Sequence, residues 1–456
     1  MLFNSLTFLT LLLPTLGLYW LVRSQPVRLW LLLAASLVFY GFHHWPSVFL
    51  LLFTIAFNFA LGLLQAKHRS RWLLFAAVVG NLSVLGWFKY AAFITQTVTS
   101  ALASLGWAVE TPRMSALLPL GISFFTFQVV AYQVDVHRGE ISAERSFVRF
   151  AVFKCFFPQL IAGPIVQAKD FLPQLREALV FNPRMFHRGV WLVLCGAALK
   201  IGVADVLAQF ADDAFQAPAR LTTVAAWMGV YAYAFQLYAD FWGYSTMAVG
   251  LSALFGLMLP LNFDTPYLST SLQEFWRRWH ITLSGWFRNY VYIPLGGNRR
   301  HRDFNLLATM ALAGLWHGAG WNFVLWGLGH GVWLVAERNM PVLPGWDRPW
   351  GRVAKTLLVF HGVCLLWVLF RAPSLPLALE YCQKLLAAPW TTSKVPSTLS
   401  QWLLIFAILQ WPIAWTLKEE RFAKLSLVYQ WLLALICIFL IIAYAGARVD
   451  FIYFNF

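Results

Sequence analysis

Charged residues are scarce in this chain of 456 residues: Asp, Glu, Lys and Arg together make up 12%, whereas hydrophobic residues make up 60%. Soluble globular domains carry about 25% charged residues, so this composition excludes an ordinary soluble protein and indicates a polytopic membrane protein. Cysteine is scarce as well. The five cysteines are scattered, without a CxxC pair or a histidine at zinc-ligand spacing, so we expect neither a disulfide framework nor a metal site.

Acidic residues are fewer than basic ones, with 19 Asp and Glu against 34 Lys and Arg, and the net charge is +15. Such a surplus can mark a nucleic-acid-binding protein, but here the basic residues fall in short loops between apolar runs. The preference of cytoplasmic loops for Lys and Arg explains the surplus, so we expect no nucleic-acid partner. The chain also lacks a GxSxG elbow and a Walker A loop, which leaves a serine hydrolase or an ATPase without support.

Long apolar runs dominate what is present, and each has spanning or near-spanning length. They cover approximately residues 5–22, 29–42, 46–65, 72–95, 116–134, 189–206, 222–260, 305–336, 354–370, 400–416 and 428–446. Since two of them are long enough for two passes, we predict an all-α polytopic membrane protein with about 11 or 12 transmembrane helices. No internal repeat or long linker interrupts the chain, so we expect residues 1–456 to form a single integral membrane domain.

Basic residues predict the orientation of these passes. Met1–Val22 has no charge, so we interpret it as the first membrane helix rather than as a signal peptide. Placing Arg23 and Arg28 in the cytoplasm puts the N-terminus outside, and the basic loops 67–71 and 138–149 then also fall inside. The sequence does not determine on which side of the membrane the C-terminus lies.

The run 222–260 conflicts with a simple pass. The loop 207–221 before it should lie outside and the Arg-rich segment 261–304 after it inside, so the run must make one net crossing although it is long enough for two. We therefore predict a broken or re-entrant element at Asp240–Tyr244. Broken backbone at membrane depth requires surrounding protein or a water-filled cavity.

Other stretches also look unlike ordinary spans. Phe150–Val166 contains Pro158 and the pair Gly163-Pro164, and we expect this segment and the Asp240 segment to line a cavity that reaches His317. The stretch 266–304, rich in Trp, Arg and Tyr, is typical of amphipathic helices at the cytoplasmic interface. The stretch 374–388 is a weaker example of the same kind.

The uncharged run Leu306–Ala336 is too long for one upright pass. As a single helix it would extend about 46 Å, against a hydrocarbon core of about 30 Å, so it must tilt, break or fold back. Gly314, Gly318 and Gly320 favour a break near its middle, beside His317.

Two histidines lie in this run, and an ionisable side chain at membrane depth is a functional candidate because it is costly. His317 has two interpretations. It either bonds to a neighbouring helix for packing, or acts as a general base, since an unperturbed pKa of about 6.5 lets imidazole take a hydroxyl proton near neutral pH. His330 fits helix packing beyond the site.

A third histidine, His280, follows a Trp/Arg-rich stretch that interfacial anchoring alone would explain. The segment Gly296–Arg300 downstream offers free backbone amides beside two guanidinium groups, which suits a phosphate of a cytosolic cofactor. The spacing of these residues alone does not distinguish an interfacial anchor from a phosphate-binding site. The candidate cofactor-binding residues are Arg277, Arg278, Arg288, Arg299 and Arg300.

Asp240 is an acid in an aromatic stretch, and it either orients a histidine or pairs with a buried Arg or Tyr. We favour the structural role. Three further residues are possible supports of the site: Tyr244, Asn289 and Asn322.

At these residues the chain resembles the membrane-bound O-acyltransferase family, in particular its bacterial branch that acetylates alginate. The matching segments fall in order over about residues 115–337. They are Pro119–Phe124, Asp135–Gly139, Phe157–Pro164, the Asp240 stretch, Glu274–His280 and Gly314–Ala319. The chain departs from the family pattern at Trp242 and Thr246, where relatives usually have Ser and Asp, and at Asn289, where they usually have Asp.

The resemblance implies that His317 is the catalytic histidine and His280 the second histidine of the cytoplasmic side. It also implies transfer of an acyl group, expected to be acetyl, from a cytosolic thioester such as acetyl-CoA, a donor substrate rather than a permanently bound cofactor. The end acceptor would be an extracytoplasmic polysaccharide such as alginate or cellulose. A separate SGNH-like extracytoplasmic acetyltransferase subunit would complete the reaction at the bacterial inner membrane.

Two rival functions stay open. The same fold serves D-alanyl transfer from a thioester carrier to a cell-wall polymer, and a docking surface for the carrier would separate the two. A transporter or export channel would also use cavities and intramembrane histidines. The absence of inverted repeats and of paired carboxylates along the spans argues against it.

Overall fold

The structure is a computed structural model that describes residues 1, 3–107, 110, 117–340, 348–387, 390–391, 395–418, 421–446 and 451–452. Across this part of the chain the fold is helical and contains no strand, so the predicted all-α class is confirmed. The chain divides into two compact units: residues 1–189 with 251–260, and residues 190–250 with 261–456.

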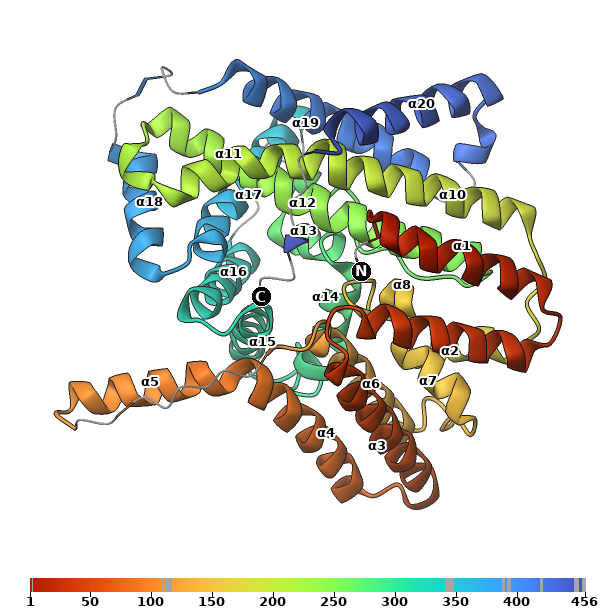
Figure 1. Cartoon of the computed structure of the whole chain (residues 1–456). Coiled ribbons are helices and arrows are strands. Elements are labelled where there is room, and N and C mark those ends of the chain that lie inside the picture. Colours follow the sequence, from red (N-terminus) through yellow and green to blue (C-terminus); the bar gives the residue numbers. More distant parts are fainter. Residues whose placement is uncertain are drawn as a thin grey trace. The chain divides into compact units, whose positions relative to one another are not determined.

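The first unit holds the N-terminal helices, which Figure 1 colours from red to yellow. They are α1 (Leu6–Leu21), α2 (Gln25–Gly41), α3 (Pro46–His68), α4 (Arg71–Leu85), η1 (Gly86–Tyr90), α5 (Ala91–Ser104), α6 (Ile122–Arg138), α7 (Phe147–Cys155), α8 (Phe157–Leu160) and α9 (Ala168–Arg176). Two helices contribute to both units: α10 (Pro183–Ala198) and α12 (Thr223–Leu254).

The second unit holds the remaining helices. They are η2 (Leu199–Ala204), α11 (Asp205–Gln216), η3 (Pro218–Arg220), η4 (Pro266–Leu268), α13 (Leu272–Arg278), α14 (Ile281–Phe287), η5 (Arg288–Tyr292), α15 (Arg302–His317), α16 (Trp321–Asn339), α17 (Pro349–Arg371), α18 (Leu375–Ala387), α19 (Ser397–Leu417), η6 (Phe422–Lys424) and α20 (Leu427–Tyr444). Of the short elements, η1, η2 and η5 are π-helical and the other three are 3₁₀ turns.

Six helical stretches of the described chain are long and apolar enough to cross a membrane. They are Pro46–His68, Arg71–Ser104, Pro183–Gln216, Pro349–Arg371, Ser397–Leu417 and Leu427–Tyr444. The larger number expected from the sequence includes shorter apolar helices, among them α1 and α2. The loop expected at 207–221 is helical as far as Gln216, because α11 continues the helix of α10 and η2.

Polar side chains join the apolar helices of the first unit. The amide groups of Asn58 on α3 and Asn81 on α4 exchange two hydrogen bonds of 2.9 Å, and Gln133 on α6 donates to the Asn58 carbonyl at 2.7 Å. Helices α3, α4 and α6 lie side by side in Figure 1. Since an unpaired amide is costly in an apolar interior, these bonds specify which helix faces meet.

The predicted irregularity of Phe150–Val166 is confirmed. Helix α7 ends at Cys155, the four-residue α8 follows, and the chain is non-helical at Gly163–Val166. A Cβ atom at Gly163 would lie 2.4 Å from the Cα atom of Gln159. The turn therefore requires glycine for close approach of its own backbone.

The predicted break at Asp240–Tyr244 is wrong, because α12 is continuous over 32 residues. Gly243 is part of a close helix crossing instead. A Cβ atom on Gly243 would lie 2.6 Å from the Gly196 carbonyl oxygen, and one on Gly196 would lie 2.5 Å from the Gly243 carbonyl oxygen. We predicted a break because the run 222–260 is long enough for two passes but makes one net crossing, whereas a single continuous helix of 32 residues takes up most of this length.

Of the three alternatives predicted for Leu306–Ala336, which were a tilt, a break or a fold-back, the structure has a break at the glycines followed by a fold-back. Helix α15 ends at His317, Gly318 and Gly320 are extended, and α16 returns alongside α15 (Figure 1). A Cβ atom on Gly314 would lie 2.1 Å from the Phe323 carbonyl oxygen, and one on Gly327 would lie 2.1 Å from the Met310 carbonyl oxygen. The two glycines thus allow the backbones to touch, as small residues do between membrane helices.

Short helices occupy the stretches that were predicted to lie at the interface. Residues 266–304 form η4, α13, α14 and η5 before α15 begins, and Leu375–Ala387 forms α18. In α18 the Tyr381 ring stacks on Phe215 at 4.2 Å, and its hydroxyl donates to the Ala226 carbonyl. This helix is therefore packed against α11 and α12 rather than free.

We expect Gly327→Ala to destabilise the protein, because the new methyl group would meet a backbone carbonyl that cannot move aside. Overpacking of this kind costs about 1–3 kcal/mol, seen as a lower melting temperature of the purified protein in detergent. Gly329→Ala is the matched control, since its methyl group meets only the end of the Leu366 side chain. Equal melting temperatures for the two variants would contradict the close backbone contact.

Candidate functional site

His317 is placed by the turn of the α15–α16 hairpin. It is the last residue of α15 and is 3% exposed. Its imidazole lies among three aromatic rings, with centroid distances of 5.0 Å to Trp316, 5.2 Å to Trp326 and 5.2 Å to Phe370. A side chain at Gly318 would collide with the Phe323 ring at 2.1 Å, so the turn after the histidine depends on glycine.

His280 lies at the N-terminal end of α14, and its backbone is left-handed, with φ of +42°. A non-glycine residue in that region is strained and persists only where its surroundings hold it, which is common at functional sites. The imidazole is fully buried, 4.6 Å from the Phe241 ring and 6.0 Å from Trp316. Both histidines therefore contact Trp316. Burial lowers the pKa of His280 to about 3, so this imidazole is neutral at physiological pH.

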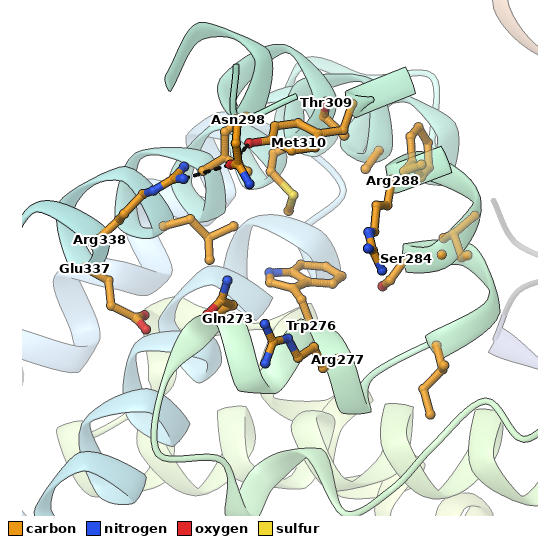
Figure 2. Close-up of a pocket in the computed structure, with 18 of the residues that line it drawn as sticks. Gln273, Trp276, Arg277, Ser284, Arg288, Asn298, Thr309, Met310, Glu337 and Arg338 are labelled. Carbon is orange, nitrogen blue, oxygen red and sulfur yellow. Dashed lines mark hydrogen bonds between the residues drawn. The ribbon is translucent and has the colours of Figure 1, made fainter. Parts of the chain in front are cut away.

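A cavity of about 800 Å³ reaches His317. Its wall comes from α13, α14, η5, the segment before α15, and the facing sides of α15 and α16. In Figure 2, Arg288 and Arg338 lie on opposite sides of the cavity, with Trp276 and Arg277 between them. All lining residues fall between Gln273 and Arg338, so Asp240–Tyr244, which we expected at a cavity reaching His317, is not part of the wall of this one.

The cavity wall is basic. It contains the guanidinium groups of Arg277, Arg288 and Arg338 and one carboxylate, Glu337, which accepts the Leu272 N–H at 2.7 Å. Arg338 donates to the Asn298 side-chain oxygen at 2.8 Å. An enclosure with this charge, apolar walls and a buried histidine suits a ligand that is anionic at one end and apolar along its length.

Two of the five predicted cofactor-binding arginines, Arg277 and Arg288, line the cavity. Arg278 does not: it pairs with Glu274 at 2.6 Å and lines a separate pocket of about 350 Å³. Arg299 and Arg300 are exposed and absent from the lining. Arg277 and Arg278, adjacent on the short helix α13, thus line different pockets. The sequence alone does not show that their side chains point in different directions.

Three of the five backbone amides of Gly296–Arg300, which we predicted to be free, are hydrogen-bonded within the chain. The N–H of Gly296 donates to the Ile293 carbonyl at 3.0 Å, that of Gly297 to the Tyr292 carbonyl at 2.9 Å, and that of Arg299 to the Gly296 carbonyl at 3.0 Å. Positive φ angles of 115° at Gly296 and 53° at Gly297 fold the segment back onto η5 and use these donors.

Sequence reasoning missed Arg338 and Asn298. Arg338 lies near the C-terminal end of α16, and the hairpin returns it to the segment that precedes α15. The fold-back alternative for Leu306–Ala336 contained this information, since two antiparallel helices of similar length bring their outer ends together. Trp276 and Gln273 also line the cavity and were not singled out.

Asp240 belongs to a buried ion cluster. Its Oδ1 atom lies 2.9 Å from the Lys200 ammonium group, which also donates to Asp205 at 2.5 Å. Its Oδ2 atom accepts the backbone N–H of Ile452 at 2.8 Å. The favoured structural role fits these contacts, although the partner is a lysine rather than the expected Arg or Tyr.

The other possible supports lie as follows. Tyr244 is buried on α12 and stacks on Phe451 at 4.3 Å. The Asn322 amide donates to the Leu369 and Ala372 carbonyls at 3.3 and 3.0 Å and so closes the end of α17. Asn289 lies on η5 and is absent from the cavity lining. Across the residues that the structure describes, no group of three or more His, Cys, Asp or Glu is arranged to hold a metal ion.

His317, His280 and the cavity all lie within a segment that matches known proteins. A model of the membrane-bound O-acyltransferase family matches residues 140–344. The probable alginate O-acetylase of Azotobacter vinelandii is 43% identical over 414 residues, which are 86% of this chain and 80% of that protein. This chain belongs to the membrane-bound O-acyltransferase family. It is a multi-pass membrane protein and an O-acyltransferase, which implies an acyl donor.

Two further relatives of this O-acyltransferase have names that state different activities. The peptidoglycan O-acetyltransferase of Helicobacter pylori is 36% identical over 83% of this chain and 79% of that protein. The teichoic acid D-alanyltransferase of Streptococcus thermophilus is 28% identical over 55% of this chain and 68% of that protein. These two relatives thus differ in the acyl group and the polymer that their names state.

We expect Lys200→Met to lower the melting temperature far more than Asp240→Asn does. Removing the lysine leaves two buried carboxylates without their cation, a change that typically costs about 3–5 kcal/mol, whereas Asp240→Asn leaves Lys200 paired with Asp205. Thermal unfolding of both variants in detergent measures the difference. A Lys200→Met protein that melts with the wild type would show that the cluster does not stabilise the fold.

Proposed function

We propose that this O-acyltransferase takes an acetyl group from cytosolic acetyl-CoA and passes it toward an extracytoplasmic polysaccharide such as alginate or cellulose. The observation that carries the proposal is the position of His317 on the wall of a cavity that also holds Arg277, Arg288 and Arg338. Guanidinium groups bind phosphates through paired hydrogen bonds, and the donor carries phosphates at the end remote from its thioester. The cavity offers such groups together with a histidine.

In the proposed reaction His317 is the general base. The imidazole takes the proton of an acceptor hydroxyl, whose oxygen attacks the thioester carbonyl carbon. The new C–O bond forms while the C–S bond breaks, and the proton passes from the imidazole to the leaving thiolate. His280, which contacts the same indole ring of Trp316, supports the geometry of the site as the second histidine.

The acetyl group and the acceptor are supported by relatives that match most of this chain. Alginate O-acetylases and a peptidoglycan O-acetyltransferase are 36–43% identical to this chain over more than four fifths of its length. The D-alanyltransferase supports a second candidate, in which the donor thioester is held on a carrier protein. Its lower identity and coverage make this alternative weaker.

The wider setting follows from the same resemblance. We propose that a separate extracytoplasmic acetyltransferase subunit, SGNH-like, completes transfer to the polysaccharide, and that the protein lies in the bacterial inner membrane with its N-terminus outside. Basic residues in alternate loops support this orientation. We also propose that the passes form one functional domain over residues 1–456.

We expect His317→Ala to abolish acyl transfer while the protein still folds. Loss of a general base typically lowers the rate about 10²- to 10⁴-fold. The measurement is thiol release from acetyl-CoA by purified protein with an acceptor, together with mass spectrometry of the cell-surface polysaccharide. Full acetylation by a folded His317→Ala variant would leave the histidine with a packing role only.

We expect Arg288→Gln with Arg338→Gln to raise the apparent KM for acetyl-CoA about tenfold or more, because both side chains line the cavity. Arg299→Gln with Arg300→Gln is the matched control, since it removes the same charge from two neighbouring exposed residues that do not line the cavity. The KM of each double variant is measured under identical conditions. A larger rise for the control pair would place the donor phosphates at Gly296–Arg300 instead.

A further inference from the structure

The last residues that the structure describes, Phe451 and Ile452, are buried against α12. The Phe451 side chain is 0% exposed and its ring stacks on Tyr244 with centroids 4.3 Å apart and an interplanar angle of 22°. The backbone N–H of Ile452 donates to Oδ2 of Asp240 at 2.8 Å. A stacked ring and a hydrogen bond to a buried carboxylate therefore attach this segment to a helix more than 200 positions earlier in the sequence.

The same face of α12 holds His280. Phe241 follows Asp240 directly, and its ring lies 6.1 Å from Phe451 and 4.6 Å from the His280 imidazole. The interplanar angle between Phe241 and His280 is 86°, so the two rings meet edge to face. One aromatic ring thus contacts both the C-terminal segment and the second histidine.

Both oxygens of Asp240 are engaged, since Lys200 occupies Oδ1 and the Ile452 N–H occupies Oδ2. The carboxylate and the neighbouring turn of α12 are therefore fixed from two directions. His280 needs such support, because its left-handed backbone is strained and relies on its surroundings to hold the imidazole in place.

We propose that the segment Phe451–Ile452 is a positioning element of the acyl-transfer site, and that Phe451 acts through Phe241 to hold the His280 imidazole. Phe451 is a positioning residue, since it acts on His280 through the Phe241 ring, which contacts both. The inference rests on the proposed function, in which His280 supports acyl transfer. It assigns a role in catalysis to a segment outside the region that matches the family model.

The test uses point variants of the full chain in detergent. We expect Phe451→Ala to lower kcat about 10- to 100-fold, as displacement of a catalytic group does, while the KM for acetyl-CoA changes less than about twofold. Phe451→Leu, which keeps apolar volume, should recover part of the rate. Ile452→Pro removes the N–H that bonds Asp240 and should lower kcat, whereas Ile452→Ala keeps that N–H and should retain it.

A second readout follows His280 directly. Carbethoxylation by diethyl pyrocarbonate, located by mass spectrometry, should become faster at His280 in Phe451→Ala. His330 is the internal control, because it is equally buried but packs on Trp276, Trp326 and Trp367. Faster modification of both histidines would indicate general loosening and would overturn the proposal.

Wild-type kcat and unchanged His280 modification in folded Phe451→Ala and Ile452→Pro would also overturn it. If Phe451→Ala cannot be purified as a monodisperse protein, kcat and the rate of His280 modification are measured on Phe451→Leu instead. Wild-type values of both in Phe451→Leu would overturn the proposal. If the wild type itself transfers no acetyl group, the proposed function fails, and this outcome is distinct because the histidine modification is still measured.

Discussion

A lysine buried among carboxylates fixes the position of α12, and much of the second unit depends on it. Lys200 pairs with Asp205 next to its own helix and with Asp240 on α12. This pairing is possible because Gly196 and Gly243 let the two backbones touch one turn away. A buried charge without a partner is strongly destabilising, so the cluster holds the crossing in one register. The face of α12 that carries Asp240, Phe241 and Tyr244 is fixed as a result.

The second determinant of the site is a hairpin built on glycine. Backbone contact at Gly314 and Gly327 brings α15 and α16 together, and the turn between them ends α15 at His317. The same hairpin places Arg338 in the cavity wall. It therefore positions both His317, the candidate base, and one arginine of the candidate anion site. Glycine is costly in an isolated helix, but here it allows a contact that side chains would prevent.

The sequence predicted those features whose cause is local. Length and glycine content predicted the turn beside His317, and Trp and Arg content predicted the short helices at 266–304. It failed where the cause lies elsewhere in the chain. The length of the run 222–260 and the loop charges suggested a broken helix, but the helix is continuous, and the partner of Asp240 is Lys200, forty positions earlier, which the sequence does not identify. The opposite directions of Arg277 and Arg278 depend on the rotation of one short helix, which no pattern in the sequence specifies.

The π-helical turn Leu199–Ala204 has a consequence for insertions and deletions. Its wider winding places Lys200 and Asp205, five positions apart, within 2.5 Å of each other. A π-helical turn holds one residue more than an α-helical turn, so loss of one residue here would restore ordinary winding and leave α11 facing nearly the same way. Loss of one residue from α11 before Asp212 would instead rotate the rest of that helix by about 100°, so that Asp212 turns away from Arg371, with which it pairs at 2.6 Å, and Phe215 from Tyr381. Single-residue deletions should therefore be tolerated better in this turn than in the first turns of α11.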